Sequence, residues 1–202
     1  MNDIEQTIKA IQQARRIDLY AMGISSSVAL DTFNRLLNLG LCVSWLPDSA
    51  NQLASASLLT SQDVAMAFSY AGETRATVKA LSLAQQQGAT TIAVTGNPHS
   101  SLARYADLKL VVTPREATAF RRNLRISARI AMLGLVDIIY LGLFNALDEA
   151  ALDKLESIVH LFGQVDEQQS SPGRSPGHSS SLSNEEENIS LPPNQAGGSH
   201  GN

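Results

Sequence analysis

The stretch "VAMAFSYAGETRATVKAL", residues 64–81, decides the fold of this chain. Its unbroken apolar run over 64–69 predicts a β-strand covered on both faces, as in a parallel sheet. The apolar spacing over 74–87 predicts a helix. Between the two lies a polar bend that contains Gly72 and runs straight into the helix. Backbone N–H groups at such a helix start suit an anion.

The same strand–helix unit recurs on both sides of this stretch. Strands are predicted over residues 17–22, 41–46, 64–69, 90–95 and 107–112. Helices are predicted over 4–11, 27–39, 49–58, 74–87, around 102, and over 119–146 and 149–162. This alternation predicts a three-layer α/β/α sandwich around a five-stranded parallel sheet with right-handed crossovers. Of the possible strand orders, we expect the flavodoxin-like order 2-1-3-4-5.

The composition changes sharply after Val165. Residues 166–202 are rich in Ser, Pro, Gly and acidic side chains and have few large apolar ones. Such a segment buries too little apolar surface to offset the entropy of ordering it. We therefore expect one domain over residues 1–165 and a disordered tail over 166–202.

Charge, cysteine content and hydropathy exclude several classes of protein. The net charge of −4 argues against a chain that wraps nucleic acid. Cys42 is the only cysteine, which excludes an internal disulfide and a four-cysteine zinc site, and its apolar surroundings predict a buried thiol. The N-terminus is too polar for a signal peptide, and the apolar run 130–144 is too short to span a membrane. We expect a cytoplasmic protein with no membrane partner.

Two loops rich in hydroxyl groups are expected to meet at one edge of the sheet. They are "GISSS" (23–27), after the first strand, and "SYAGET" (69–74), after the third. In the predicted order these strands are neighbours, and ligands bind where their connections leave in opposite directions. Two helix N-termini would face one crevice and favour a phosphate. Ordinary helix caps are the alternative explanation for these Ser and Thr residues, and neither loop is a dinucleotide or P-loop motif.

The motifs together resemble a known family. The segments are "RIDLYAMGISSSVALD", "SASLLTSQDVAMAFSYAGETRATVKAL", "AQQQGATTIAVTGNPHSSLARYADLKLVV" and "RISARIAMLGLVDIIY". They resemble the sugar isomerase (SIS) domain and, more narrowly, the effector domain of RpiR-type transcriptional regulators, over residues 5–147. The resemblance implies the SIS fold, no cofactor, and a phosphorylated sugar or sugar acid bound by a homodimer or higher homo-oligomer. Its implied phosphate contacts are Ser25, Ser69, Gly72 and Thr74, with Ser26 and Glu73 nearby. Ala71 stands where the family has a second serine, which removes one hydroxyl.

An isomerase needs a general base near the sugar carbons that exchange a proton. Glu116, after the fifth predicted strand, is the better candidate, and His99, after the fourth, is the second. Glu116 is a possible sugar contact even without catalysis, and a solvated first-turn acid is its alternative reading. The sequence shows no Ser/His/Asp or metal-ligand constellation, so we expect no metal.

The long helix predicted over 119–146 carries two patterns. Arg121, Arg125 and Arg129 repeat every four residues and predict a basic stripe that contacts the phosphate, a partner subunit or only solvent. Five apolar residues on the other side are expected to form both core and dimer seam: Phe120, Leu124, Ala128, Met132 and Leu135.

The sequence thus predicts a sensor domain and not an enzyme. The phosphosugar enters the crevice, and DNA is contacted only through a helix-turn-helix domain that is not present in this chain. A stand-alone phosphosugar isomerase is the alternative. A structural dimer module with a vestigial pocket is a third, weaker reading.

Overall fold

A computed structural model describes residues 2–113 and 126–146 of the chain. The strands are β1 (Arg16–Ala21), β2 (Val43–Trp45), β3 (Asp63–Phe68), β4 (Thr90–Thr95) and β5 (Leu108–Val111). The helices are α1 (Asp3–Gln13), α2 (Ser26–Asn38), α3 (Ser49–Ala56), α4 (Arg75–Gln86) and α6 (Ile126–Phe144), with the 3₁₀ turns η1 (Gly23–Ser25) and η2 (Ala103–Tyr105). Glu116, the first part of the helix predicted over 119–146, the helix predicted over 149–162 and the tail lie outside the described residues.

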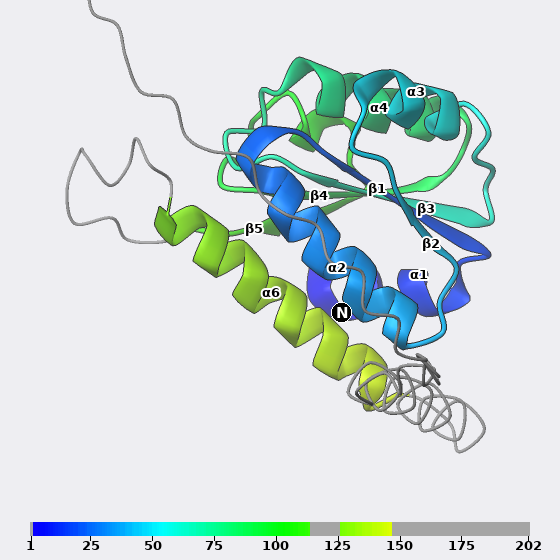
Figure 1. The fold of residues 1–202 in the computed structure, drawn as a ribbon, viewed down its shortest axis with the longest axis vertical. Coiled ribbons are helices and arrows are strands. Elements are labelled where there is room, and N and C mark those ends of the chain that lie inside the picture. Colours follow the sequence, from blue (N-terminus) through cyan, green and yellow to red (C-terminus); the bar gives the residue numbers. More distant parts are fainter. Residues whose placement is uncertain (1, 114–125, 147–202) are drawn as a thin grey trace, which may run out of the picture.

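The five strands form one parallel sheet in the order β2-β1-β3-β4-β5. The predicted strand order and three-layer architecture are therefore confirmed. Helices α1, α2 and α6 cover one face of the sheet, and α3 and α4 cover the other (Figure 1). Each helix between two strands carries the chain from the carboxyl end of one strand back to the amino end of the next. Helices α2, α3 and α4 therefore all begin at the carboxyl ends of the strands.

The two faces of the sheet carry side chains of different size. Successive residues of a strand point to opposite faces. Toward α1, α2 and α6 the strands present large apolar residues, among them Ile17, Leu19, Val64, Met66, Phe68, Ile92 and Val94. Toward α3 and α4 they present Tyr20 and three alanines, Ala65, Ala67 and Ala93. Small side chains on this second face let α3 and α4 pack close to the backbone of the sheet.

A buried ionic network joins β1 to α3. Asp18 is 1% exposed and accepts two hydrogen bonds from the Arg16 guanidinium, at 2.7 and 3.0 Å. The hydroxyls of Ser55 and Tyr20 also donate to Asp18, at 2.6 and 3.1 Å. Burial and the neighbouring Asp18 charge raise the pKa of Tyr20, which keeps its hydroxyl a donor. The network satisfies a carboxylate that would be costly to bury alone.

The two outermost strands of the sheet, β2 and β5, are short. Strands β2 and β5 have three and four residues, and each pairs on one side only. Cys42, immediately before β2, is exposed. The prediction of a buried thiol was wrong because the apolar run "LCVSWL" forms an edge strand, where the helix layers do not close over the side chains.

Helix α6 is apolar on nearly every side. Its window Ser127–Phe144 has a mean hydropathy of 1.7 and is, by length and composition alone, long and apolar enough to cross a membrane, unlike the shorter run considered in the sequence. Core helices meet the same criterion, and α6 packs against α1 and α2. The core-facing residues are Ala128, Met132, Leu135, Val136, Ile139 and Leu143. Ile130, Ile138 and Leu141 lie on the open side and are 62%, 53% and 56% exposed.

Candidate functional site

A cavity of ≈ 210 Å³ lies at the carboxyl ends of β1 and β3, where the two hydroxyl-rich loops leave the sheet. Its walls come from the loop after β1, the loop after β3 and the start of α6. The lining residues are Met22, Ile24, Ser25, Val28, Ser69, Tyr70, Thr74, Ala128, Arg129 and Met132. The two loops that the sequence placed side by side therefore do border one space.

The first loop turns sharply at Gly23, whose φ of +61° lies in the left-handed region that favours glycine. The chain then makes the single turn η1 and continues into α2. Ser25 is the N-cap of α2, but its side chain makes no capping hydrogen bond within the part of the chain that the structure describes. Its hydroxyl lies at the cavity wall and is half-buried.

The second loop is held by its own hydroxyls. The Ser69 side chain is almost fully buried; its Oγ accepts from the Gly72 N–H at 3.2 Å and lies 3.0 Å from Thr74 Oγ1. Gly72 has a φ of +72°, and a Cβ there would lie 2.1 Å from Ser100 Oγ. The Gly72 carbonyl accepts from the Leu102 N–H at 2.9 Å. The bend is thus fixed before any ligand arrives.

Of the four α-helices whose starts the structure describes, α1 and α3 are capped by their own side chains and α2 and α4 are not. Asn2 accepts from the Glu5 N–H at the start of α1, and Asp48 accepts from the Ala50 and Asn51 N–H groups at the start of α3. Among the described residues, neither Ser25 at α2 nor Thr74 at α4 makes such a bond. The helices without a side-chain cap are the two that begin at the cavity. Their partial positive ends are therefore available to an anion.

Arg129 brings a full positive charge to the same cavity. It lies in the first turn of α6 that the structure describes, and its side chain is exposed at the cavity wall. No other lining residue in the described part of the chain is charged. Within residues 2–113 and 126–146, Arg129 has no ion-pair partner. The described lining therefore combines two helix N-termini, the hydroxyls of Ser25, Ser69 and Thr74, the phenol of Tyr70 and one guanidinium.

The other predicted site residues lie at different distances from the cavity. Ser26 opens α2 and Gly72 forms the bend, and neither lines the cavity. Glu73 bonds to the loop after β4, where its carboxylate accepts from the Ser101 N–H at 2.9 Å and from the Ser101 hydroxyl at 2.6 Å. These bonds lower the pKa of Glu73. His99 lies exposed in the loop after β4.

The apolar wall of the cavity was missed in the sequence. Met22, Ile24 and Val28 alternate with the polar residues of the first loop, and Met132 faces them from α6. The signal was present, since Met22 and Ile24 flank Gly23, but apolar residues there read equally well as core. Such a wall suits the carbon skeleton of a sugar. In the described ranges no group of three or more His, Cys, Asp or Glu residues is placed to hold a metal.

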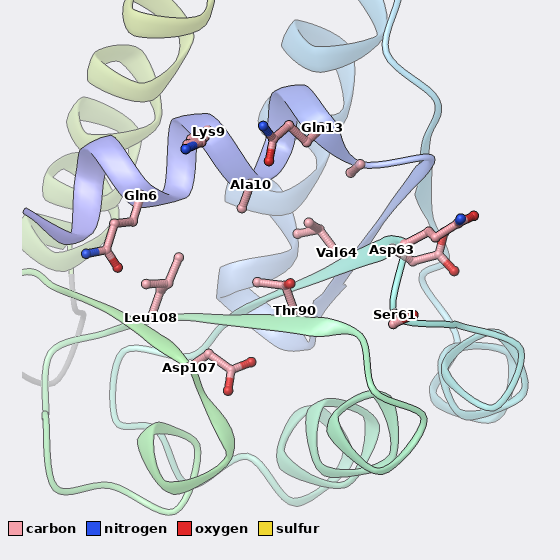
Figure 2. A pocket seen from close by; sticks show the side chains of 12 residues that line it. Gln6, Lys9, Ala10, Gln13, Ser61, Asp63, Val64, Thr90, Asp107 and Leu108 are labelled. Atoms are coloured by element: carbon pink, nitrogen blue, oxygen red, sulfur yellow. The ribbon is translucent and has the colours of Figure 1, made fainter. Parts of the chain in front are cut away.

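A second, larger cavity of ≈ 470 Å³ lies at the opposite edge of the sheet. Gln6, Lys9 and Gln13 of α1 line it together with residues at the starts of β3, β4 and β5. Figure 2 shows Gln6 and Ala10 directed from α1 toward these strand starts. The carboxylates of this cavity are already engaged. Asp63 accepts two bonds from Arg15, at 3.0 and 2.7 Å. Asp107 accepts from the N–H and hydroxyl of Thr91, at 2.8 and 2.7 Å.

Hydrogen bonding outweighs burial at Asp63. Burial alone would raise the pKa of its carboxyl, but hydrogen bonds from Arg15 and Thr60 hold that pKa below its usual range. Helices α2, α3 and α4 end at this edge of the sheet, so their partial negative ends face it. This cavity is poorly suited to an anion despite its size.

The chain is similar to proteins of one family. The model of the SIS domain family matches residues 10–141. The HTH-type transcriptional regulator RpiR of Escherichia coli K12 is 31% identical over 165 residues, which are 80% of this chain and 55% of that protein. An uncharacterized HTH-type transcriptional regulator of Haemophilus influenzae is 32% identical over 151 residues, 75% of this chain and 52% of that protein. The chain thus spans about half the length of the curated relatives it matches.

Solved structures share the fold. The sugar isomerase domain of an RpiR transcription factor from Sphaerobacter thermophilus superposes with a TM-score of 0.69 at 25% identity, covering 78% of this chain and 86% of that one. The Vibrio vulnificus NanR protein, in complex with ManNAc-6P, superposes with a TM-score of 0.72 at 22% identity, covering 81% and 61%.

Proposed function

The chain belongs to the SIS domain family, and we propose that it is the effector-sensing domain of an RpiR-type transcriptional regulator. Its effector is a phosphorylated sugar or sugar acid. One observation carries the proposal: the two helices without side-chain caps begin at one cavity, beside a guanidinium. A phosphoryl group complements all three features at once.

In this proposal the phosphoryl group lies between the two loops. The hydroxyls of Ser25, Ser69 and Thr74 and the N–H groups that open α2 and α4 donate to its oxygens. Arg129 balances its charge. Ser26 and Gly72 contribute through the backbone, and the sugar carbons lie against the apolar wall formed by Met22 and its neighbours.

We further propose that a second copy of the chain covers the open side of α6. Three large apolar side chains are exposed there, Ile130, Ile138 and Leu141, and Leu30 and Leu37 are exposed on the adjacent α2. Of the five residues expected to form core and dimer seam together, Ala128, Met132 and Leu135 face the domain's own core, so in this proposal the seam uses other side chains of α6. Phe120 and Leu124 are outside the described residues.

Effector binding and subunit contact share α6, which carries Arg129 on one side and Ile130 on the other. An attraction between Arg129 and the bound phosphoryl group would shift α6, and the second subunit would move with that helix. Couplings of this kind are typically about 1–3 kcal/mol. Contact with DNA belongs, in this proposal, to a helix-turn-helix segment outside these 202 residues, and the protein acts in the cytoplasm.

The test is a thermal-shift and calorimetric screen of hexose, pentose and amino-sugar phosphates, with ManNAc-6P and inorganic phosphate included. The unphosphorylated sugars serve as controls. A ligand that binds only the folded state raises the melting temperature, so we expect shifts with one class of phosphosugar and none with its free sugar. Equal shifts with both, or none with any phosphosugar, would contradict the proposal.

A phosphosugar isomerase is the second candidate, and the described lining of the cavity bears on it. That lining contains aliphatic hydroxyls, the phenol of Tyr70 and a guanidinium, and no carboxylate or imidazole. In this candidate function Glu116, outside the described residues, remains the expected general base. Incubation with aldose and ketose phosphates distinguishes the two functions: turnover that disappears in Glu116→Gln would favour the isomerase over the sensor.

A further inference from the structure

Gln52 of α3 is a buried amide that joins two strand ends. It is 1% exposed. Its Nε2 donates to the carbonyl of Ala21 at 3.0 Å and to the carbonyl of Leu46 at 2.7 Å. Ala21 is the last residue of β1, and Leu46 follows the last residue of β2. Since both neighbours are acceptors, the nitrogen must face them, and the orientation of the amide is fixed by chemistry.

The Gln52 amide takes the place of a hydrogen-bond donor that β2 would supply if it were longer. Strand β1 runs beyond its last partner in β2, which is Trp45 opposite Leu19. Alternate residues of a strand direct their carbonyls to the same side, and Ile17 bonds toward β2 through the Cys42 carbonyl. The Ala21 carbonyl therefore faces β2 as well, where the chain has already turned into α3. Gln52 supplies the donor that the missing strand would have given.

Ala21, the end of β1 to which Gln52 bonds, leads directly into the first loop. Met22 follows Ala21, its sulfur lies 3.8 Å from Gln52 Nε2, and it lines the cavity. Three residues later Ser25 lines the cavity too. Gln52 itself does not line it, so its influence passes through the backbone of this loop.

The Gln52 side chain buries one polar atom without a hydrogen-bond partner, which lowers the stability of the fold. Both amide hydrogens are committed, and the buried Oε1 atom has no partner among the residues the structure describes. An apolar side chain of the same length would avoid the orphaned oxygen but would leave the carbonyls of Ala21 and Leu46 without this donor. Retaining an amide here fits a role in placing the loop.

We propose that Gln52 is a positioning residue of the effector site: it fixes where the first loop leaves β1 and thereby sets the distance between Ser25 and the second loop. The proposal rests on the proposed function, since it concerns the same phosphate site. It adds a residue that contacts no ligand and lies on the opposite helix layer from Arg129.

The test compares Gln52→Met with Ser55→Ala in the full chain. Both alter buried hydrogen bonds of α3, but Ser55 bonds to Asp18, away from the cavity. Binding of inorganic phosphate and ManNAc-6P is measured well below the melting temperature. We expect Gln52→Met to weaken binding about tenfold, as loss of an orienting contact does. Ser55→Ala should lower the melting temperature and leave affinity within about twofold of wild type.

A second readout follows the loop without a ligand. Amide hydrogen exchange and chemical shifts of residues 22–27 should change in Gln52→Met and stay unchanged in Ser55→Ala. If Gln52→Met fails to fold, Gln52→Glu keeps the shape: its carboxylate cannot donate, and protonation restores one donor. Its affinity relative to wild type should then rise as the pH is lowered. Arg16 and Asp18, the charged pair that contacts Ser55 one turn away, are kept in both proteins.

The outcomes separate the two proposals. If wild type binds neither probe, the proposed function and this inference both fall. If wild type binds and the Gln52 variants bind equally well with an unchanged loop, only the inference is overturned. A loss of affinity of the same size in Ser55→Ala also overturns it, because it would make the effect one of general stability.

Discussion

The two ends of the sheet offer a comparison within one molecule. The amino end has the larger cavity, ≈ 470 Å³, with Lys9 and two carboxylates at its walls. The carboxyl end has a cavity of ≈ 210 Å³ whose described lining carries one charged residue, Arg129. At the amino end the carboxylates are paired and helices finish; at the carboxyl end helices α2 and α4 begin without side-chain caps. The candidate site is thus distinguished by helix N-termini whose N–H groups lack side-chain caps, and not by the volume of its cavity.

The largest loss of phosphosugar affinity is expected from Gly72→Ala. The new methyl would lie 2.1 Å from Ser100 Oγ at a φ that disfavours side chains, so the bend must move. We expect affinity to fall about 100-fold or more, because overpacking costs about 1–3 kcal/mol and here displaces the loop itself. Gly40→Ala is the matched control: its φ is +75°, but nothing lies within 4 Å. Calorimetry on both should show a loss of stability in each and a loss of binding only at Gly72.

Removing the cavity's charge should have the next largest effect. Arg129→Gln is expected to weaken phosphosugar binding about tenfold, the lower range for a charge-assisted bond at an exposed side chain. Arg75→Gln removes an equal charge from the first turn of α4 without altering the cavity lining. Titrations at two salt concentrations test the pair. Equal losses of affinity in both variants would mean that Arg129 acts only through the overall positive potential at the carboxyl ends of the strands and not through contact with the ligand.

Single hydroxyls should matter less. Ser69→Ala and Thr74→Ala are each expected to weaken binding about two- to tenfold, the usual value of one hydrogen bond. Ser69→Ala should have the greater effect, since Ser69 also accepts from the Gly72 N–H. Ser61→Ala, at the wall of the amino-end cavity, is the control. Unchanged affinity in both site variants would place the phosphate elsewhere.

The amino end should affect stability alone. Asp63→Asn removes the Arg15 pair and should lower the free energy of unfolding by about 1–2 kcal/mol at neutral pH, with phosphosugar affinity unchanged. Because the folded pKa of Asp63 is depressed, its contribution is complete above the unfolded pKa of about 4 and is lost as the pH falls below it. Urea unfolding of both proteins across this range should show the difference shrinking in acid. A constant difference, or weaker binding, would contradict this assignment.

The sequence predicts most of this fold because local and long-range signals agree. Residues 64–81 contain a buried strand, a glycine bend and a helix in succession, and the structure places all three there. The roles of Ser25, Ser69 and Thr74 as ligand contacts stay predictions, although the structure brings them to one cavity. Their convergence follows from strand order, which periodicity alone does not specify.

Where the structure departs from these expectations, local contacts or position in the fold give the reason. Glu73 sits beside the bend in sequence, but it precedes the N-cap of α4 and its carboxylate bonds to Ser101, so its role at the phosphate stays a prediction. Cys42 lies in an apolar run whose edge position no local pattern reveals. Arg129 was read as part of a stripe whose other members, Arg121 and Arg125, lie outside the described residues; the packing of α6 places Arg129 at the cavity.

The brief outer strands have a consequence for how copies of this chain meet. A long, unpaired strand invites another chain to extend the sheet, which is the first step of amyloid-like stacking. Here β2 offers three residues, and β5 offers four with the charged Lys109 among them. Both outer strands offer few backbone groups for an incoming strand to pair with, so we expect copies of the chain to meet through helices and not by extending the sheet.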